Sequence, residues 1–196
     1  MAAARYPSEY AWPYITVSSL VYADRDPRGY LFARAGLALC ALAGIFWSVL
    51  LRRAGRRDPA TVLALGYACM LGCALLPDGP APIPRAHDFL AVCAFLLLCC
   101  GLSLWLLESR ARGTAKPTGS AWRARLHVMA LWSPILAAGL SQIYIAHARP
   151  HLPWVGIAWR AQGVPIYLSF ALWEWVMCAL LSLSMLSLSR DAADAG

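Results

Sequence analysis

The chain alternates long apolar stretches with short polar ones along nearly its whole length. An α-helix crosses the hydrocarbon core of a bilayer, about 30 Å thick, with about 20 apolar residues. Stretches of about this length cover residues 30–51, 87–107, 126–146 and 165–188, and a slightly shorter one covers 60–76. The pattern therefore predicts an all-α fold, a polytopic bundle of five transmembrane helices.

The composition points to the same class of protein. Hydrophobic residues make up 60% of the 196 residues and charged residues 14%, whereas soluble domains carry about 25% charged residues. No long polar tract separates one group of apolar stretches from another. We therefore expect a single transmembrane domain over residues 1–196, in which residues 1–29 form a polar loop before the first helix.

The formal net charge of +7 is concentrated in two loops and the C-terminal tail, which hold ten of the 17 Lys and Arg residues. This distribution is typical of cytoplasmic loops and not of a nucleic-acid-binding surface. We predict a multi-pass protein of the inner (cytoplasmic) membrane whose N-terminal segment, with residues 77–86 and 147–164, lies outside and whose tail lies inside. The ten residues are Arg52, Arg53, Arg56, Arg57, Arg110, Arg112, Lys116, Arg123, Arg125 and Arg190.

Several polar residues of the N-terminal segment are candidates for a structural or a functional role. The sequence "DPRG" at Asp26–Gly29 predicts a tight turn into the first helix, with Asp26 as a cap. Asp24 has no such structural task, which makes it the better functional candidate. Ser18 and Ser19 lack the G-x-S-x-G context of a nucleophilic serine, so loop capping is the favoured role for both.

The third apolar stretch opens with His87 and Asp88 side by side. Asp88 is favoured by the helix dipole, which makes it an N-terminal stabiliser. The same dipole disfavours the charged form of His87, so that this side chain remains available as a neutral base, ligand or hydrogen-bond donor.

Glu174 is the clearest anomaly, since it stands inside the last apolar stretch. A carboxylate there costs a few kcal/mol unless it is paired, protonated or turned toward a polar interior. With a helix starting at Pro165, it would lie roughly 13 Å along the axis. Arg34 is the candidate partner, because it lies about one turn into the first helix from the same side. The pair fits a functional site and a packing contact equally well.

Aromatic residues gather in the first and last outer segments. Rings with a polar edge prefer the headgroup level of a membrane, so an aromatic belt is the favoured interpretation. A lipid site roofed by the outer loops is compatible with such a belt. The residues concerned include Trp12, Tyr14, Tyr22, Tyr30, Trp159, Tyr167, Trp173 and Trp175.

Nothing in the sequence favours a metal or another cofactor, and none is predicted. A bis-histidine haem needs two ligands at similar depth, whereas His87 and His127 start from opposite faces. His147 and His151 flank a proline that breaks their helical spacing, although a metal site joining His87 with one of them stays open. The seven cysteines all fall inside apolar stretches, where packing is their expected role.

The order of these features resembles the FRAG/DRAM/SFK group of six-helix membrane proteins and its bacterial relatives of unknown function. The matching elements are a polar outer loop with serines, a Pro/Gly turn before a helix, and a His-Asp pair that opens a later helix. The chain departs from the family pattern after "SSLVYA", where the acidic residue is delayed to Asp24. The residues that carry the resemblance are Val17, Ser18, Ser19, Leu20, Pro27, Gly29, His87 and Asp88.

The resemblance implies association with membrane lipids. A sixth helix encoded upstream of Met1 would complete the family layout, and the alternative is a five-helix chain whose short N-terminal segment is itself exported. Our leading hypothesis is an inner-membrane protein that binds or organises membrane lipid through an outer-face site, alone or in a homo- or hetero-oligomer. The alternatives are a lipid-processing enzyme that uses His87 as a base with nearby carboxylates, and a small proton-linked transporter that uses Glu174. The candidate outer-face residues are Ser18, Ser19, Asp24, Arg34, His87, Asp88 and Glu174.

Overall fold

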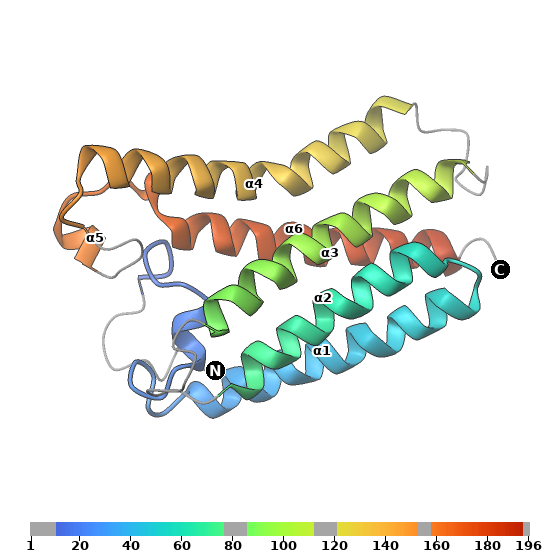
Figure 1. Cartoon of the computed structure of the whole chain (residues 1–196), viewed down its shortest axis with the longest axis horizontal. Coiled ribbons are helices and arrows are strands. Elements are labelled where there is room, and N and C mark those ends of the chain that lie inside the picture. The colour runs from blue at the N-terminus through green and yellow to red at the C-terminus, as the bar shows by residue number, and fades with distance from the viewer. Residues whose placement is uncertain (1–10, 77–85, 112–120, 153–157, 194–196) are drawn as a thin grey trace. The chain divides into compact units, whose positions relative to one another are not determined.

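The computed structural model describes residues 11–76, 86–111, 121–152 and 158–193. This part of the chain is helical and contains no strand (Figure 1). Residues 1–10 of the predicted polar loop lie outside it. The helices are α1 (Tyr30–Arg53), α2 (Arg57–Leu75), α3 (Ala86–Ala111), α4 (Ala121–Ala148), the short α5 (Ala158–Ala161) and α6 (Phe170–Ala193), with 3-10 turns η2 (Ser18–Val21) and η3 (Ile166–Leu168).

Five of these helices are long and apolar enough to cross a membrane. They are α1, α2, and the parts of α3, α4 and α6 that cover Ala86–Glu108, Ala124–Ala148 and Phe170–Ser187. The prediction of an all-α fold with five membrane-type helices is confirmed, and the protein is a membrane protein by this criterion.

The chain divides into two compact units. Unit 1 comprises Met1–Leu31 and Ala130–Leu180, and unit 2 comprises Phe32–Met129 and Leu181–Gly196. Both α4 and α6 therefore contribute residues to each unit. The single domain expected over residues 1–196 stays a prediction.

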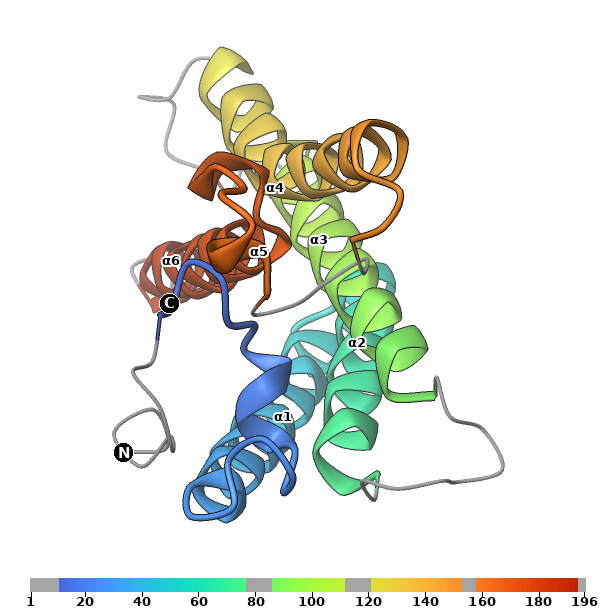
Figure 2. The same ribbon diagram turned by 90° about the vertical axis from the view of Figure 1, so that its left-hand side faces the viewer.

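In unit 2, helices α1, α2 and α3 run alongside one another in both views (Figures 1 and 2). Glycines allow the close approach of α2 and α3. A Cβ atom on Gly101 would lie 2.6 Å from Cγ of Leu63, and one on Gly66 would lie 3.0 Å from Cγ of Leu98. Between helices in a bilayer there is little hydrophobic driving force, so such close van der Waals packing is the main stabilising contact.

Unit 1 has its own apolar core, which joins the end of α4 to the segment around α5. Ile145, Trp159 and Val164 are buried, and Tyr14, Leu152 and Leu168 pack against them. The Trp159 side chain, carried by the four-residue helix α5, is only 1% exposed. Burial of one large ring fixes a connection that is too short to be a stable helix alone.

Local backbone chemistry explains how the helices end and how α4 continues. Gly55 and Gly163 adopt positive φ values of 81° and 65°, and they terminate α1 and α5. Glycine is favoured at such positions because it has no Cβ.

Helix α4 continues through Pro134 without a break. Pro134 cannot donate to the carbonyl of Ala130, which instead accepts a 3.0 Å hydrogen bond from the Ser133 hydroxyl.

The start of the last helix differs from the prediction. The sequence suggested a helix from Pro165, whereas the structure has the 3-10 turn η3, an extended Ser169 with φ −73° and ψ 126°, and α6 only from Phe170. Proline is compatible with the first turn of a 3-10 helix and of an α-helix, so Pro165 does not show which of the two begins there. Glu174 thus lies about 6 Å, and not 13 Å, from the start of its helix.

Candidate functional site

The strongest candidate site surrounds Glu174 in unit 1. This carboxylate is 5% exposed and projects from the second turn of α6. Its oxygens accept two hydrogen bonds from the N-terminal segment, which we define as residues 11–29. The backbone N–H of Val17 donates to Oε2 at 2.8 Å, and the Ser18 hydroxyl donates to Oε1 at 3.0 Å. Glu174 therefore joins two parts of the chain that are 157 residues apart.

The two donors stand at the start of η2, where backbone N–H groups lack helical partners. A carboxylate at such a position is stabilised by charge-assisted hydrogen bonds. Val17 has no side-chain cap of its own, so Glu174 performs this role from a distant helix. The predicted Glu174–Arg34 ion pair stays a prediction, because Arg34 belongs to unit 2.

Further hydrogen bonds lie on the buried side of the N-terminal segment. The hydroxyls of Thr16 and Ser19 lie 2.8 Å apart, and the Ser19 N–H donates to Oγ1 of Thr16 at 3.1 Å. Both residues are buried, at 5% and 4% exposed. Thr16 therefore caps the N–H of Ser19, whereas the Ser19 hydroxyl contacts side chains, so the loop-capping role expected of Ser19 stays a prediction.

Two aromatic side chains attach the same segment to the rest of unit 1. The hydroxyl of Tyr14 donates to the carbonyl of Val164 at 2.9 Å, and Nε1 of Trp175 donates to the carbonyl of Ile15 at 3.1 Å. Ile15 itself is 1% exposed. Residues 11–29 of the predicted polar loop are thus a folded segment whose backbone is held at several points.

Asp26 makes the turn that was predicted at "DPRG". Its carbonyl accepts hydrogen bonds from the N–H groups of Gly29 and Tyr30, and Oδ1 accepts from Gly29 at 2.9 Å. Asp26 is fully buried, and Oδ2 has no hydrogen-bond partner within the described ranges. A Cβ atom at Gly29 would overlap the Asp26 carboxylate, so the turn requires glycine there.

The remaining predicted site residues are divided between the two units. Asp24 belongs to unit 1 and is exposed. Arg34 and His87 are half-buried and Asp88 is exposed, and all three belong to unit 2. Their participation in one site with Ser18 and Glu174, including the role of His87 as a base, stays a prediction.

The sequence analysis did not single out Thr16, the Val17 amide or Arg25. The Nη1 atom of Arg25 donates to Oγ of Ser19 at 3.3 Å, and its guanidinium carbon lies 5.1 Å from the centre of the Tyr22 ring. A run of hydroxyl residues at Thr16, Ser18 and Ser19 was the available signal. The Val17 amide could not be identified from the sequence, because every residue type except proline carries a backbone N–H.

The geometry supports anchoring better than catalysis. A hydrogen bond from a serine hydroxyl to a carboxylate is the contact through which a base can activate a nucleophilic serine. Here the other oxygen of Glu174 is occupied by the Val17 amide, so that the carboxylate is used to hold backbone and side chain together. The arrangement positions the N-terminal segment on the first turns of α6.

No group of three or more His, Cys, Asp or Glu side chains suited to a metal ion occurs among the residues that the structure describes. Comparisons with family models, with curated proteins and with solved structures gave no match. The interpretation of the site therefore depends on its own geometry.

Proposed function

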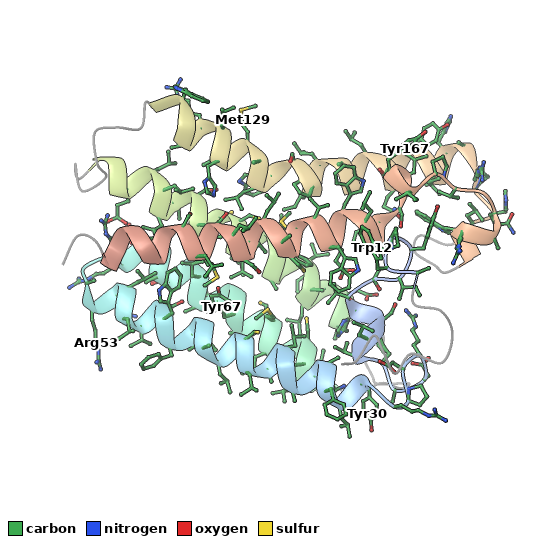
Figure 3. All side chains as sticks on the ribbon, turned by 180° about the vertical axis from the view of Figure 1, so that it is seen from behind. Trp12, Tyr30, Arg53, Tyr67, Met129 and Tyr167 are labelled. Atoms are coloured by element: carbon green, nitrogen blue, oxygen red, sulfur yellow. The ribbon has the colours of Figure 1, made fainter. Side chains whose placement is uncertain are left out.

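We propose that this multi-pass protein resides in the inner (cytoplasmic) membrane and binds or organises membrane lipid at the end of unit 1 where α6 begins. The observation that carries the proposal is the exposure of large amphipathic rings on a folded support. Trp12 is 51% and Tyr167 64% exposed, and both lie near the start of α6 (Figure 3).

The support is rigid enough to present these rings in fixed positions. Nε1 of Trp173 donates to the carbonyl of Tyr167 at 2.8 Å, which fixes the end of η3 against α6. Tyr14, two residues after Trp12, is tied to Val164. Rings with an apolar face and a polar edge are stabilised at the headgroup level of a bilayer, where both parts are satisfied.

The charge pattern and the family resemblance support the same assignment. Arg52, Arg53, Arg56 and Arg57 flank the loop between α1 and α2, and basic loops of this kind remain in the cytoplasm. The N-terminal segment would then face outward. The FRAG/DRAM/SFK resemblance implies lipid association for a segment with this layout.

Lipid retention measured by native mass spectrometry tests the proposal. The purified protein, reconstituted in nanodiscs of bacterial polar lipid and released in the instrument, should carry bound phospholipid. We expect the double variant Trp12→Ala/Tyr167→Ala to bind lipid about thirtyfold more weakly, because two interfacial rings of about 1 kcal/mol each contribute about 2 kcal/mol.

Trp122→Ala is the matched control, since Trp122 is similarly exposed, at 55%, but belongs to unit 2. It should retain lipid like the wild type. Equal retention by the wild type and the double variant would contradict the proposed site.

A further inference from the structure

Arg25 is an exposed arginine whose position is nevertheless fixed. One guanidinium nitrogen donates to Oγ of Ser19 at 3.3 Å, and the planar group lies over the Tyr22 ring at 5.1 Å. Arginine stacked on an aromatic face loses less conformational freedom when its other N–H groups bind a ligand. The remaining donors of Arg25 are therefore preorganised.

The fixed position of Arg25 depends on the buried network of unit 1. Ser19 is 4% exposed and is bonded to Thr16 through its hydroxyl and its N–H. The turn η2, which carries Ser19, is held by Glu174 through Val17 and Ser18. Glu174 is thus a positioning residue for Arg25, acting through η2.

Neither Arg25 nor the exposed Arg28 has an acidic partner in the described part of the chain. Asp26, which lies between them, is turned inward, fully buried and bonded to the Gly29 amide. The exposed charges of the turn are therefore two guanidinium groups and the carboxylate of Asp24. The turn ends at Tyr30, the first residue of a membrane-type helix, which is where phospholipid headgroups lie.

We propose that Arg25 and Arg28 bind the phosphate of a phospholipid headgroup and that Asp24 contacts its ammonium group, so that the site prefers an ethanolamine phospholipid. This inference rests on the proposed function and names the lipid class that it recognises. Arginine is suited to phosphate because its fork of donors matches two phosphate oxygens. A carboxylate beside it complements the amine of the same zwitterionic headgroup and disfavours a purely anionic one.

Three lipids with identical acyl chains separate the contributions of phosphate and amine. They are phosphatidylethanolamine, phosphatidylglycerol and a diglucosyl diacylglycerol without phosphate, each titrated into the detergent-purified full chain and measured by native mass spectrometry. The wild type should bind them in that order of affinity. Arg25→Gln should weaken phosphatidylethanolamine binding about tenfold, the equivalent of 1.4 kcal/mol, which is typical of charge-assisted hydrogen bonds.

The control for charge alone is Arg160→Gln, an exposed arginine of the same unit, which should leave phosphatidylethanolamine binding unchanged. Arg25→Lys should be intermediate, because it keeps the charge and loses the fork. Asp24→Asn should reduce the preference for ethanolamine over glycerol headgroups about threefold, as expected for a partly exposed ionic contact. Unchanged hydrogen exchange over residues 11–29 verifies that each variant remains folded.

Three results would overturn the inference. They are wild-type affinity in Arg25→Gln, an equal loss in Arg160→Gln, and saturable binding of inorganic phosphate at Arg25 without any preference among the lipids. Retention of all three lipids alike by the wild type would reject headgroup recognition and leave lipid binding intact. Retention of none would reject the proposed function itself.

Discussion

In unit 1, hydrogen bonds join segments that lie 150 to 160 residues apart in the chain, whereas in unit 2 the helices meet mainly through close contacts at glycine. The N-terminal segment of unit 1 is attached by the Glu174 carboxylate, the Tyr14 hydroxyl and the Trp175 indole. Each of these contacts requires a particular donor facing a particular acceptor. Directional contacts therefore specify this unit.

Unit 2 is specified by shape. Glycines of α1, α2 and α3 face Tyr67, Leu63 and Leu98 so closely that a methyl group would not fit without a shift. Trp47 and Trp105 add a tilted ring contact between α1 and α3, with centroids 4.8 Å apart. Polar contacts between its helices do occur, as between His127 and Ser184, where Nε2 and Oγ are 2.7 Å apart.

The difference follows from the setting of each unit. Backbone in irregular segments must have its polar groups satisfied, so unit 1 needs capping side chains. Long helices satisfy their own backbone, so those of unit 2 need only fit together. The directional contacts of unit 1 are better suited to support a functional surface, because they can hold non-helical backbone in place.

The largest expected effect is that of Glu174→Ala. It removes both acceptors of the Val17 amide and the Ser18 hydroxyl and should cost about 3 kcal/mol of unfolding free energy, since two half-buried donors lose a charged partner. Hydrogen exchange at Val17–Ser19 should rise sharply while exchange in α2 and α3 stays unchanged. Glu174→Gln, which keeps one acceptor oxygen, should lose about half as much. Unchanged exchange over residues 16–19 in the alanine variant would mean that Glu174 does not anchor the segment.

An intermediate effect is expected from Gly44→Ala in unit 2. The added methyl group would overlap the ring of Tyr67, and overpacking of this kind costs about 1 to 3 kcal/mol. The control on the same helix is Gly36→Ala, where nothing lies within 4 Å of the added atom. Denaturation in sodium dodecyl sulfate should show a lower midpoint for the first variant and no loss for the second. Equal midpoints would show that shape does not specify unit 2.

The smallest effect is expected from Ser184→Ala, which removes the partner of His127. Hydrogen bonds between membrane helices contribute about 0.6 kcal/mol on average, because the separated helices find other partners. The same denaturation experiment measures the change. A loss as large as that of Glu174→Ala would remove the contrast between the two units.

Part of the candidate site was predictable from the sequence. Glu174 was recognisable as an anomaly because a carboxylate in an apolar stretch needs an explanation, and the turn at Asp26–Gly29 followed from its residue types. The partner of Glu174 was not predictable. Charge complementarity suggested Arg34, which stays a prediction, while the partners that the structure shows are the amide of Val17 and the hydroxyl of Ser18. A pattern gives the depth of a residue along its helix but not which distant segment folds against it.

The sequence by itself determined the helical class, the five membrane-type segments and the turn before α1, because hydrophobic length and turn chemistry are local properties. Only the tertiary structure decided that α6 begins at Phe170, that the N-terminal segment is folded, and that Arg25 is held over Tyr22 by a network reaching back to Glu174. Those features depend on contacts across more than 150 residues of chain, and such contacts are set by the packing of the whole unit and not by any single stretch.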